Sequence, residues 1–412
     1  MRSKRRVAAF LLAAAALAPA SAGAEPRSFD GVAEALLGGR FYADLRYRLE
    51  HVDQAGVPRE AEASTLRTVL GYETGTWHGF YLSVEAENVS VIGPERFNDT
   101  IDGRTDFPVV PDPPGTELNQ LFLAYDVPEV EARVGRQRIK LDNERFIGAV
   151  GFRQNDQVFD AAWITGHWLP GVLVSYGYID EVQRVFGSDS PVGTFESDTH
   201  LLHAALPDFA FGGLSVYGYL IDLENADAFS SQSYGARLTG ERRLWFNPDL
   251  ALTYAVEFAY QTDYGDNPSD YSATYLLLNP GIEMRNLAAA VGYERLGGDG
   301  QNSFQTPLAT LHAFNGLTDQ FVVTPPDGLE DLFATVEYTF DDAAPFESVA
   351  LAAAYHEFYA AEGSLHYGNE WSAGVSFALT RRLSLALEHA RYEADRFATD
   401  VSKTWLTLRV TF

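Results

Sequence analysis

The sequence has 412 residues, no cysteine, and 57 acidic residues against 30 Lys and Arg residues. The missing thiols exclude disulfides, thiolate zinc sites and cysteine nucleophiles. A net charge of −27 argues against a nucleic-acid partner, because binding phosphates requires an excess of basic residues. The 21 Tyr, 27 Phe and 35 Gly residues are typical of a β-rich chain with many turns.

The first 24 residues have the features of a secretory signal peptide. Basic residues precede the apolar run from Val7 to Ala18, and Ala22-Gly23-Ala24 has the small residues of a cleavage site. The run is short for a membrane-spanning helix, so an N-terminal anchor helix is the less favoured alternative. Removal of residues 1–24 would remove four basic residues and make the net charge of the remaining chain −31.

Apolar and polar residues alternate through most of the remaining chain. The pattern is clear in residues 40–50, in residues 371–379 and in residues 250–261, where Leu252 and Val256 alternate with residues such as Ala255. Such alternation predicts strands with one apolar and one polar face. The segments run to about 9–12 residues, which is the length that a tilted strand needs to cross a bilayer.

The connections between these segments alternate between short and long. Val127-Pro128-Glu129 and Asn279-Pro280-Gly281 are predicted short turns, whereas residues 91–116, 140–156 and 295–329 form long connections. This arrangement predicts an all-β, transmembrane antiparallel β-barrel of about 18 strands, with short periplasmic turns and long extracellular loops. We therefore expect an outer-membrane protein of a Gram-negative bacterium, in which the signal peptide precedes two regions: a short periplasmic segment at residues 25–39 and one barrel domain at residues 40–412.

The last ten residues also alternate and end on Phe412. This pattern is typical of the strand through which the barrel-assembly machinery recognises outer-membrane proteins. The expected partners are that machinery, membrane lipid and lipopolysaccharide. A secreted β-sandwich or β-helix is the alternative, and it is less favoured because the outward face is apolar on nearly every predicted strand.

The polar faces of the predicted strands would line the barrel interior, which in a barrel of this size is too wide for side chains to fill. A water-filled channel is therefore expected, and its charged residues would set the field that acts on ions. Each of these residues could instead form an ion pair that braces the wall, and for any one of them bracing is the favoured interpretation. The predicted lumen residues are Asp44, Arg46, Arg48, Arg67, Glu85, Glu87, Arg237, Glu257, Glu337, Glu388 and Arg409.

Residues 134–160 resemble the alginate-export family of outer-membrane porins. The resemblance rests on Gly135-Arg136-Gln137-Arg138, on Asp142-Asn143 and on Phe159-Asp160, with a second similar stretch at residues 296–316. It implies an 18-stranded monomeric barrel whose arginines attract an anionic polysaccharide. The residues that it carries over are Arg136, Arg138, Arg145 and Arg153.

Strict alternation from Val130 and Val134 would turn Arg136 and Arg138 outward, where lipid disfavours charge. A bulge at Gly135 could re-aim the strand inward; otherwise the arginines lie above the hydrocarbon region. Whether Arg136, Arg138 and Asp142 contact a solute or brace a folded-in loop stays open at this point.

The predicted function is a channel for passive passage of a hydrophilic, anionic or sugar-like solute, or of a polysaccharide such as alginate. An outer-membrane barrel enzyme, of the phospholipase or protease type, is the alternative, although no known catalytic motif is present. No cofactor is expected, apart from Ca²⁺ that acidic loops could hold beside lipopolysaccharide. The apolar residues of the connection 295–329, such as Leu308 and Phe314, predict that it folds back into the barrel mouth and narrows the channel.

Overall fold

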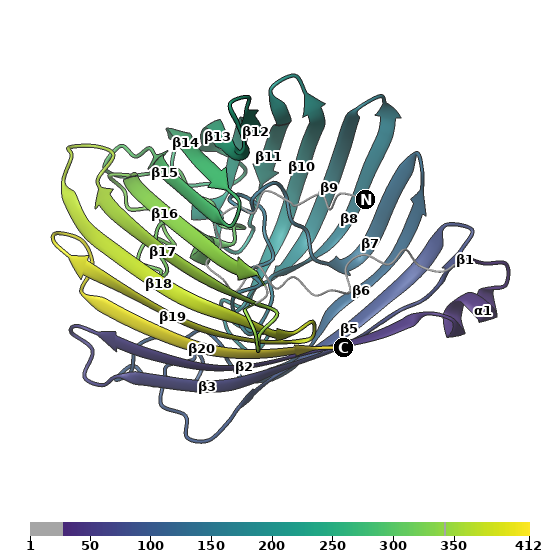
Figure 1. Ribbon diagram of the computed structural model, residues 1–412, viewed down its shortest axis with the longest axis horizontal. Helices are drawn as coiled ribbons and strands as arrows, with labels where there is room; N and C mark the ends of the chain where they lie inside the picture. The colour runs from purple at the N-terminus through teal and green to yellow at the C-terminus, as the bar shows by residue number, and fades with distance from the viewer. Residues whose placement is uncertain (1–27, 342) are drawn as a thin grey trace.

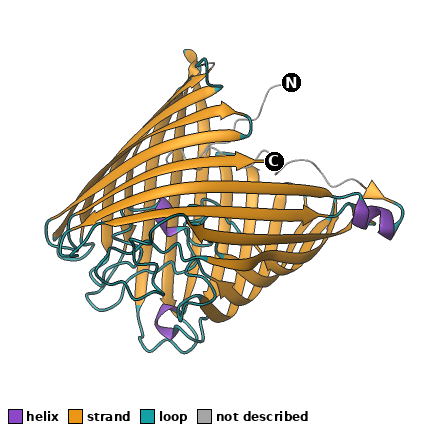
Figure 2. Ribbon diagram, turned by 90° about the horizontal axis from the view of Figure 1, so that it is seen from below, coloured by secondary structure: helices purple, strands orange, loops and turns teal. Residues whose placement is uncertain are grey.

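The computed structural model describes residues 28–341 and 343–412, so the predicted signal peptide lies outside the described residues. Eighteen long antiparallel strands form one closed barrel, as the sequence predicted (Figure 1). Two further strands of two residues each, β1 and β4, pair with one another at the rim of the barrel. The only α-helix in the described part of the chain, α1, lies at the same rim, and two short 3-10 turns lie among the loops (Figure 2).

The strands follow one another around the barrel in chain order. The first nine long strands are β2 (Arg40–Gln54), β3 (Ala61–Glu73), β5 (Phe80–Val91), β6 (Gly115–Val127), β7 (Val130–Gln137), β8 (Val158–Leu169), β9 (Val172–Gln183), β10 (Thr194–Phe209) and β11 (Gly212–Ile221). The other nine are β12 (Ser231–Leu244), β13 (Asn247–Asp263), β14 (Ser272–Met284), β15 (Leu287–Leu296), β16 (Leu329–Asp341), β17 (Ser348–Tyr359), β18 (His366–Thr380), β19 (Leu383–Ala394) and β20 (Val401–Thr411). The short elements are β1 (Ser28–Phe29), α1 (Val32–Leu37), β4 (Thr76–Trp77), η1 (Asp227–Phe229) and η2 (Leu311–Ala313).

The barrel closes where β2 pairs with β20, in register from Asp44 opposite Thr411 to Gln54 opposite Val401. Closure removes the two free edges that an open sheet would expose.

The two faces of the barrel wall differ in chemistry. Leu252 and Val256 are 43% and 41% exposed on the outside, whereas Ala255 faces the interior. Similar apolar side chains are exposed on the outer face of almost every strand. An apolar outer surface on a closed antiparallel barrel is stable in contact with lipid, so this is a protein of the outer membrane. In the described part of the chain, no helix is long and apolar enough to cross a membrane.

One predicted turn is wrong. Asn279-Pro280-Gly281 lies inside β14, and the turn comes instead at Arg285 and Asn286. The pairing of β14 with β15 is interrupted at Asn279 and Pro280, because proline has no N–H to donate. The side-chain amide of Asn279 donates to the carbonyl of Val291 at 3.0 Å. This bond supplies a donor next to Pro280, which has no backbone N–H.

Two long connections enter the barrel. We call residues 138–157, between β7 and β8, the first inward loop, and residues 297–328, between β15 and β16, the second inward loop. Ile147 of the first loop and Leu308 of the second are fully buried. The two loops are also hydrogen-bonded to each other, and in one such bond the Gly148 N–H donates to the Leu308 carbonyl at 2.9 Å. The prediction that the connection 295–329 folds inward is thereby confirmed.

Candidate functional site: the barrel interior

Arg46 and Arg48 lie on the inward face of β2 and hold the backbone of the first inward loop. Arg46 donates to the carbonyls of Gly151, at 2.7 Å, and of Arg153. Arg48 donates to the carbonyl of Phe152 at 2.6 Å, and its guanidinium lies 4.1 Å from the centre of that ring. Both arginines are almost completely buried, so they act as braces beneath the loop.

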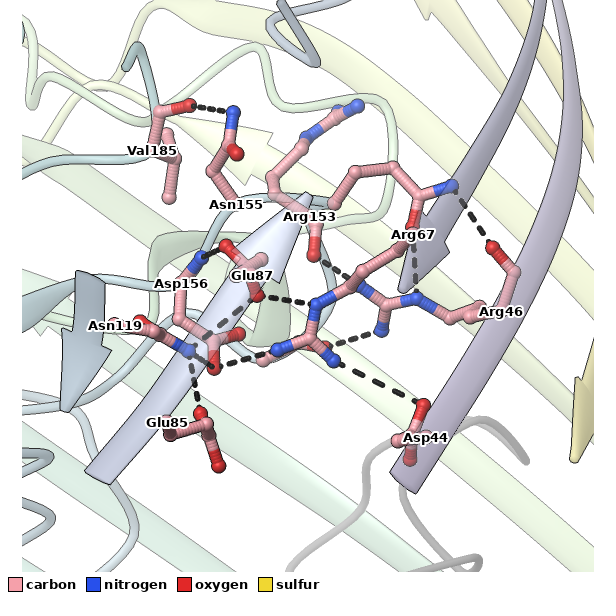
Figure 3. Close-up of polar contacts among 12 residues, drawn as sticks. Asp44, Arg46, Arg67, Glu85, Glu87, Asn119, Arg153, Asn155, Asp156 and Val185 are labelled. Carbon is pink, nitrogen blue, oxygen red and sulfur yellow. Dashed lines mark hydrogen bonds and ion pairs between the residues drawn. The ribbon is translucent and has the colours of Figure 1, made fainter. Parts of the chain in front are cut away.

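A second group of charges joins β3 and β5 to the end of the same loop (Figure 3). Asp156 accepts from Arg67 at 2.8 Å and from the Nε of Arg138 at 2.7 Å. Arg67 also pairs with Glu87, and Arg138 with Glu85. Burial alone would raise the pKa of Asp156, but the arginines outweigh it and hold that pKa below its usual range. The carboxylate is therefore ionised, and each positive charge has a nearby negative one.

Asp319 connects the two inward loops to the wall. Its carboxylate accepts from Arg153 of the first loop at 2.9 Å, from Lys403 of β20 at 2.8 Å and from His312 at 2.7 Å. Arg153 also pairs with Glu50 of β2 at 3.0 Å. His312 stacks on Phe152 with ring centres 3.5 Å apart. This group, Glu50, Arg153, His312, Asp319 and Lys403, is called the loop anchor below.

The loop anchor has a defined charge state. Burial raises the pKa of Asp319, but His312, Lys403 and Arg153 outweigh that effect and hold it well below the usual range. Burial lowers the pKa of His312, and the neighbouring Asp319 offsets only part of this effect. At neutral pH the His312 imidazole is therefore neutral, and the Asp319 carboxylate is ionised beside Arg153 and Lys403.

Other predicted interior residues form pairs farther around the wall. Arg237 donates to Glu257 at 2.6 Å across β12 and β13. Asp142 accepts from Ser215 at 2.6 Å and lies 3.1 Å from the Nε2 of His203. Burial tends to raise the pKa of Asp142, yet these partners lower it overall. The structure thus places Arg237, Glu257 and Asp142 in the interior, each with a partner.

Arg136 departs from its predicted position in the lumen. It lies opposite Leu121, an outward-facing residue of β6, and its neighbour Gln137 is the residue that turns inward and is buried. Strand pairing continues past Gly135 without the expected bulge, so nothing re-aims the side chain. Arg136 forms a two-pronged pair with Asp160, at 2.8 and 2.6 Å, at the loop end of the wall. Arg138 follows the last residue of β7 and does turn inward.

Open space remains on the opposite side of the interior. A cavity of about 700 Å³ lies between the inward loops and the wall of β12 to β17. Asp142, Asn143 and residues 312–317 border it on the loop side. We call this cavity the vestibule. Carboxylates that border it on the wall are Glu283, Glu294, Asp331, Glu337 and Asp341.

The cluster of Asp142, His203 and Ser215 does not have the arrangement of a nucleophile beside its base. Ser215 and His203 both bond to Asp142 rather than to each other, so the histidine is not placed to activate the serine. Among the residues that the structure describes, no group of three or more histidine or acidic side chains is arranged to hold a metal ion.

Alternation along the strands could have identified two anchor residues that were not predicted. Glu50 and Lys403 lie on the inward faces of β2 and β20, next to predicted residues. His312 and Asp319 carried no such signal, because they lie on a loop with no strand periodicity.

Comparison with known proteins supports the fold. No protein-family model matches the sequence, and no curated protein matches it. Three solved structures align over 90% or more of this chain and 98% of their own chains. Pseudomonas aeruginosa OccD3 (OpdP) has a TM-score of 0.73 and 15% identity and covers 97% of this chain. Acinetobacter baumannii OccAB2 has a TM-score of 0.71 and 16% identity, the outer membrane protein opdK from Pseudomonas aeruginosa has a TM-score of 0.67 and 15% identity, and each covers 90% of this chain. These neighbours are outer-membrane porins, and none of them supports the alginate-export family specifically.

Proposed function

We propose that this protein is an outer-membrane channel for small hydrophilic solutes, and that the solutes pass along one side of the barrel interior. The observation that carries the proposal is the vestibule, a cavity of about 700 Å³ beside the β12 to β17 wall. On the other side, the first inward loop covers β2, β3 and β5 and buries their charged residues. A cavity of this size accommodates a small molecule.

An anionic polysaccharide such as alginate is a less well supported cargo. Arg46, Arg67 and Arg153 are each at most 5% exposed, and they bond to backbone or carboxylate groups of the protein. A polyanion would need a row of accessible basic groups, which these buried arginines do not offer.

The alternative function, a barrel enzyme, would need a nucleophile or activated water beside an accessible base. The interior histidines His312 and His356 are instead hydrogen-bonded to Asp319 and Asp331, and neither has a serine partner among the hydrogen bonds of the described residues. The channel proposal therefore fits the interior better.

Conductance in a planar lipid bilayer tests the proposal. We expect purified protein to give small, stepwise currents, and deletion of residues 301–325 to increase the step size because it removes most of the second inward loop. The deletion variant must first show the compact, heat-sensitive mobility of a folded barrel on a denaturing gel. Absence of steps in both proteins would contradict a channel, and hydrolysis of phospholipid or peptide by the intact protein would favour the enzyme.

A further inference from the structure

One row of interior residues crosses the vestibule wall from strand to strand and continues onto β18 and β19. Each member lies directly opposite the next in the strand register, so all share the inward face. In order from β14 to β19, the row consists of Glu283, Ala288, Glu337, Ala352, Gly374 and Glu388. Its charged members are all glutamates, and alanine or glycine separates them.

The row climbs from the periplasmic end of the barrel toward its middle. Glu283 is the second-last residue of β14, beside a periplasmic turn, whereas Glu388 lies in the middle of β19. Glu283 and Glu337 are two strands apart, which corresponds to about 10 Å. A solute that moved along this wall would therefore meet Glu283 and then Glu337, the two glutamates of the row that border the vestibule.

Most basic groups near the vestibule are already paired. Arg237 pairs with Glu257 at 2.6 Å, and Arg285 pairs with Asp249 at 3.0 Å on the exposed rim. The imidazole of His356 lies 2.9 Å from Asp331. By contrast, neither Glu283 nor Glu337 has a cation within ion-pair distance in the described part of the chain, although both border the vestibule.

Glu388 continues the row onto β19, where it is buried. It is 3% exposed, and its Oε2 has no hydrogen-bond partner among the described residues. A buried carboxylate oxygen without a donor is costly. Only Ala352 and Gly374 lie between Glu388 and Glu337 in the row, so no basic side chain separates the two glutamates along it.

We propose that this row of glutamates makes the channel selective for cations, and that the vestibule takes small solutes carrying an ammonium or guanidinium group. The carboxylates would accept hydrogen bonds from the cationic group. The methyl groups of Ala288 and Ala352, with Phe333 and Leu317 nearby, would contact an apolar part of the solute. The inference rests on the proposed channel function and specifies its substrate class.

The test measures the reversal potential of the channel in a gradient of potassium chloride. Wild-type protein should prefer K⁺ over Cl⁻. The double variant Glu283→Gln, Glu337→Gln should lower the permeability ratio at least about twofold, because one charge about 10 Å away changes the local concentration of an ion in water by roughly that factor. Swelling of proteoliposomes should likewise be faster with arginine hydrochloride than with sodium glutamate.

The matched control is Glu129→Gln, Glu196→Gln, which removes the same charge from exposed positions outside the vestibule. It should leave the permeability ratio unchanged. Preference for Cl⁻ in the wild type, or an equal loss in both double variants, would overturn the cation inference while leaving the channel intact. Absence of conductance would overturn the channel itself. Should the vestibule double variant fail to fold, the single variant Glu283→Gln decides the question. A smaller decrease in its permeability ratio supports the inference, and an unchanged ratio overturns it.

Discussion

At the scale of single residues, Asp319 is the carboxylate on which three partners converge. Arg153, Lys403 and His312 all bond to it, and the lysine has no other ion pair within the described residues. Removing one member of a buried ion network leaves the others uncompensated, which costs more than the pair itself contributes. Asp319 is therefore one of the side chains that hold the second inward loop, beside Glu370 of β18, which accepts from Thr318.

We predict that Asp319→Asn lowers the free energy of unfolding by about 3 kcal/mol, since Lys403 then lies buried without its counter-charge. Urea unfolding in lipid vesicles, followed by tryptophan fluorescence, measures this. Asp106→Asn is the control, because Asp106 pairs with Arg59 while both side chains are about half exposed. The control should change stability by less than about 1 kcal/mol, and equal effects would show that Asp319 does not anchor the loop.

His312 should make the stability of the barrel depend on pH. Its pKa is lowered in the folded protein by burial, whereas a histidine in the unfolded chain titrates near about 6.5. As the pH falls below that value, the unfolded chain binds a proton that the folded chain resists, so stability decreases. We expect a smaller decrease between pH 7.5 and pH 5.5 in His312→Phe than in the wild type, in the same unfolding measurement. Identical pH dependence in both proteins would assign the effect to other groups.

Alternation identified the interior arginines, and bracing was the favoured role for each of them, but it did not identify their partners. Arg46, Arg48 and Arg67 face inward as their strand positions predicted. Their partners come from a loop about 100 residues away, as in the bond between Arg46 and Gly151, and no local pattern encodes that contact. Arg136 shows the reverse case, because strand parity alone places it correctly, and the bulge that was one of the two alternatives did not form.

At the scale of elements, each strand has one register that keeps charge out of the lipid. In β13, Val256 is exposed on the outside while the adjacent Ala255 borders the vestibule. We predict that Val256→Arg destabilises the barrel by about 2–4 kcal/mol, because arginine near the middle of the bilayer is disfavoured by that amount. Ala255→Arg should cost less, since its side chain enters water. Equal losses in urea unfolding would contradict the assigned register.

The strands could be predicted because two-residue periodicity is a local property of the sequence. Their ends were less certain, and Pro280 shows the reason. A proline next to glycine usually marks a turn, but in β14 the Asn279 side chain supplies a donor that lets the strand continue. The inward course of the second loop was predictable for another reason: buried residues such as Leu308 have no place on an exposed loop.

At the scale of the whole molecule, the barrel exists because its first and last long strands pair. The seam of β2 with β20 brings Asp44 opposite Thr411 and Gln54 opposite Val401. Without it, the sheet would have two edges whose backbone groups lie unpaired in lipid, which a membrane does not tolerate. Closure also places Lys403 beside Asp319, so the seam and the loop anchor form together.

The last strand closes the barrel and is also expected to be recognised by the assembly machinery, and changes at Phe412 can test these two roles separately. Phe412 is 60% exposed, and its contacts with β2 include backbone hydrogen bonds to Ala43. In Phe412→Ala this backbone pairing can persist, so we predict that the purified variant refolds in detergent micelles to the compact form seen on an unboiled denaturing gel. A chain lacking residues 401–412 should not reach that form, because β2 then pairs only with β3 and has no partner at the seam. In cells, we expect Phe412→Ala to accumulate less in the outer membrane, since there assembly depends on recognition of the strand. Failure of Phe412→Ala to refold in micelles would mean that the terminal aromatic ring serves closure itself, and normal accumulation in cells would remove the ring as a recognition element.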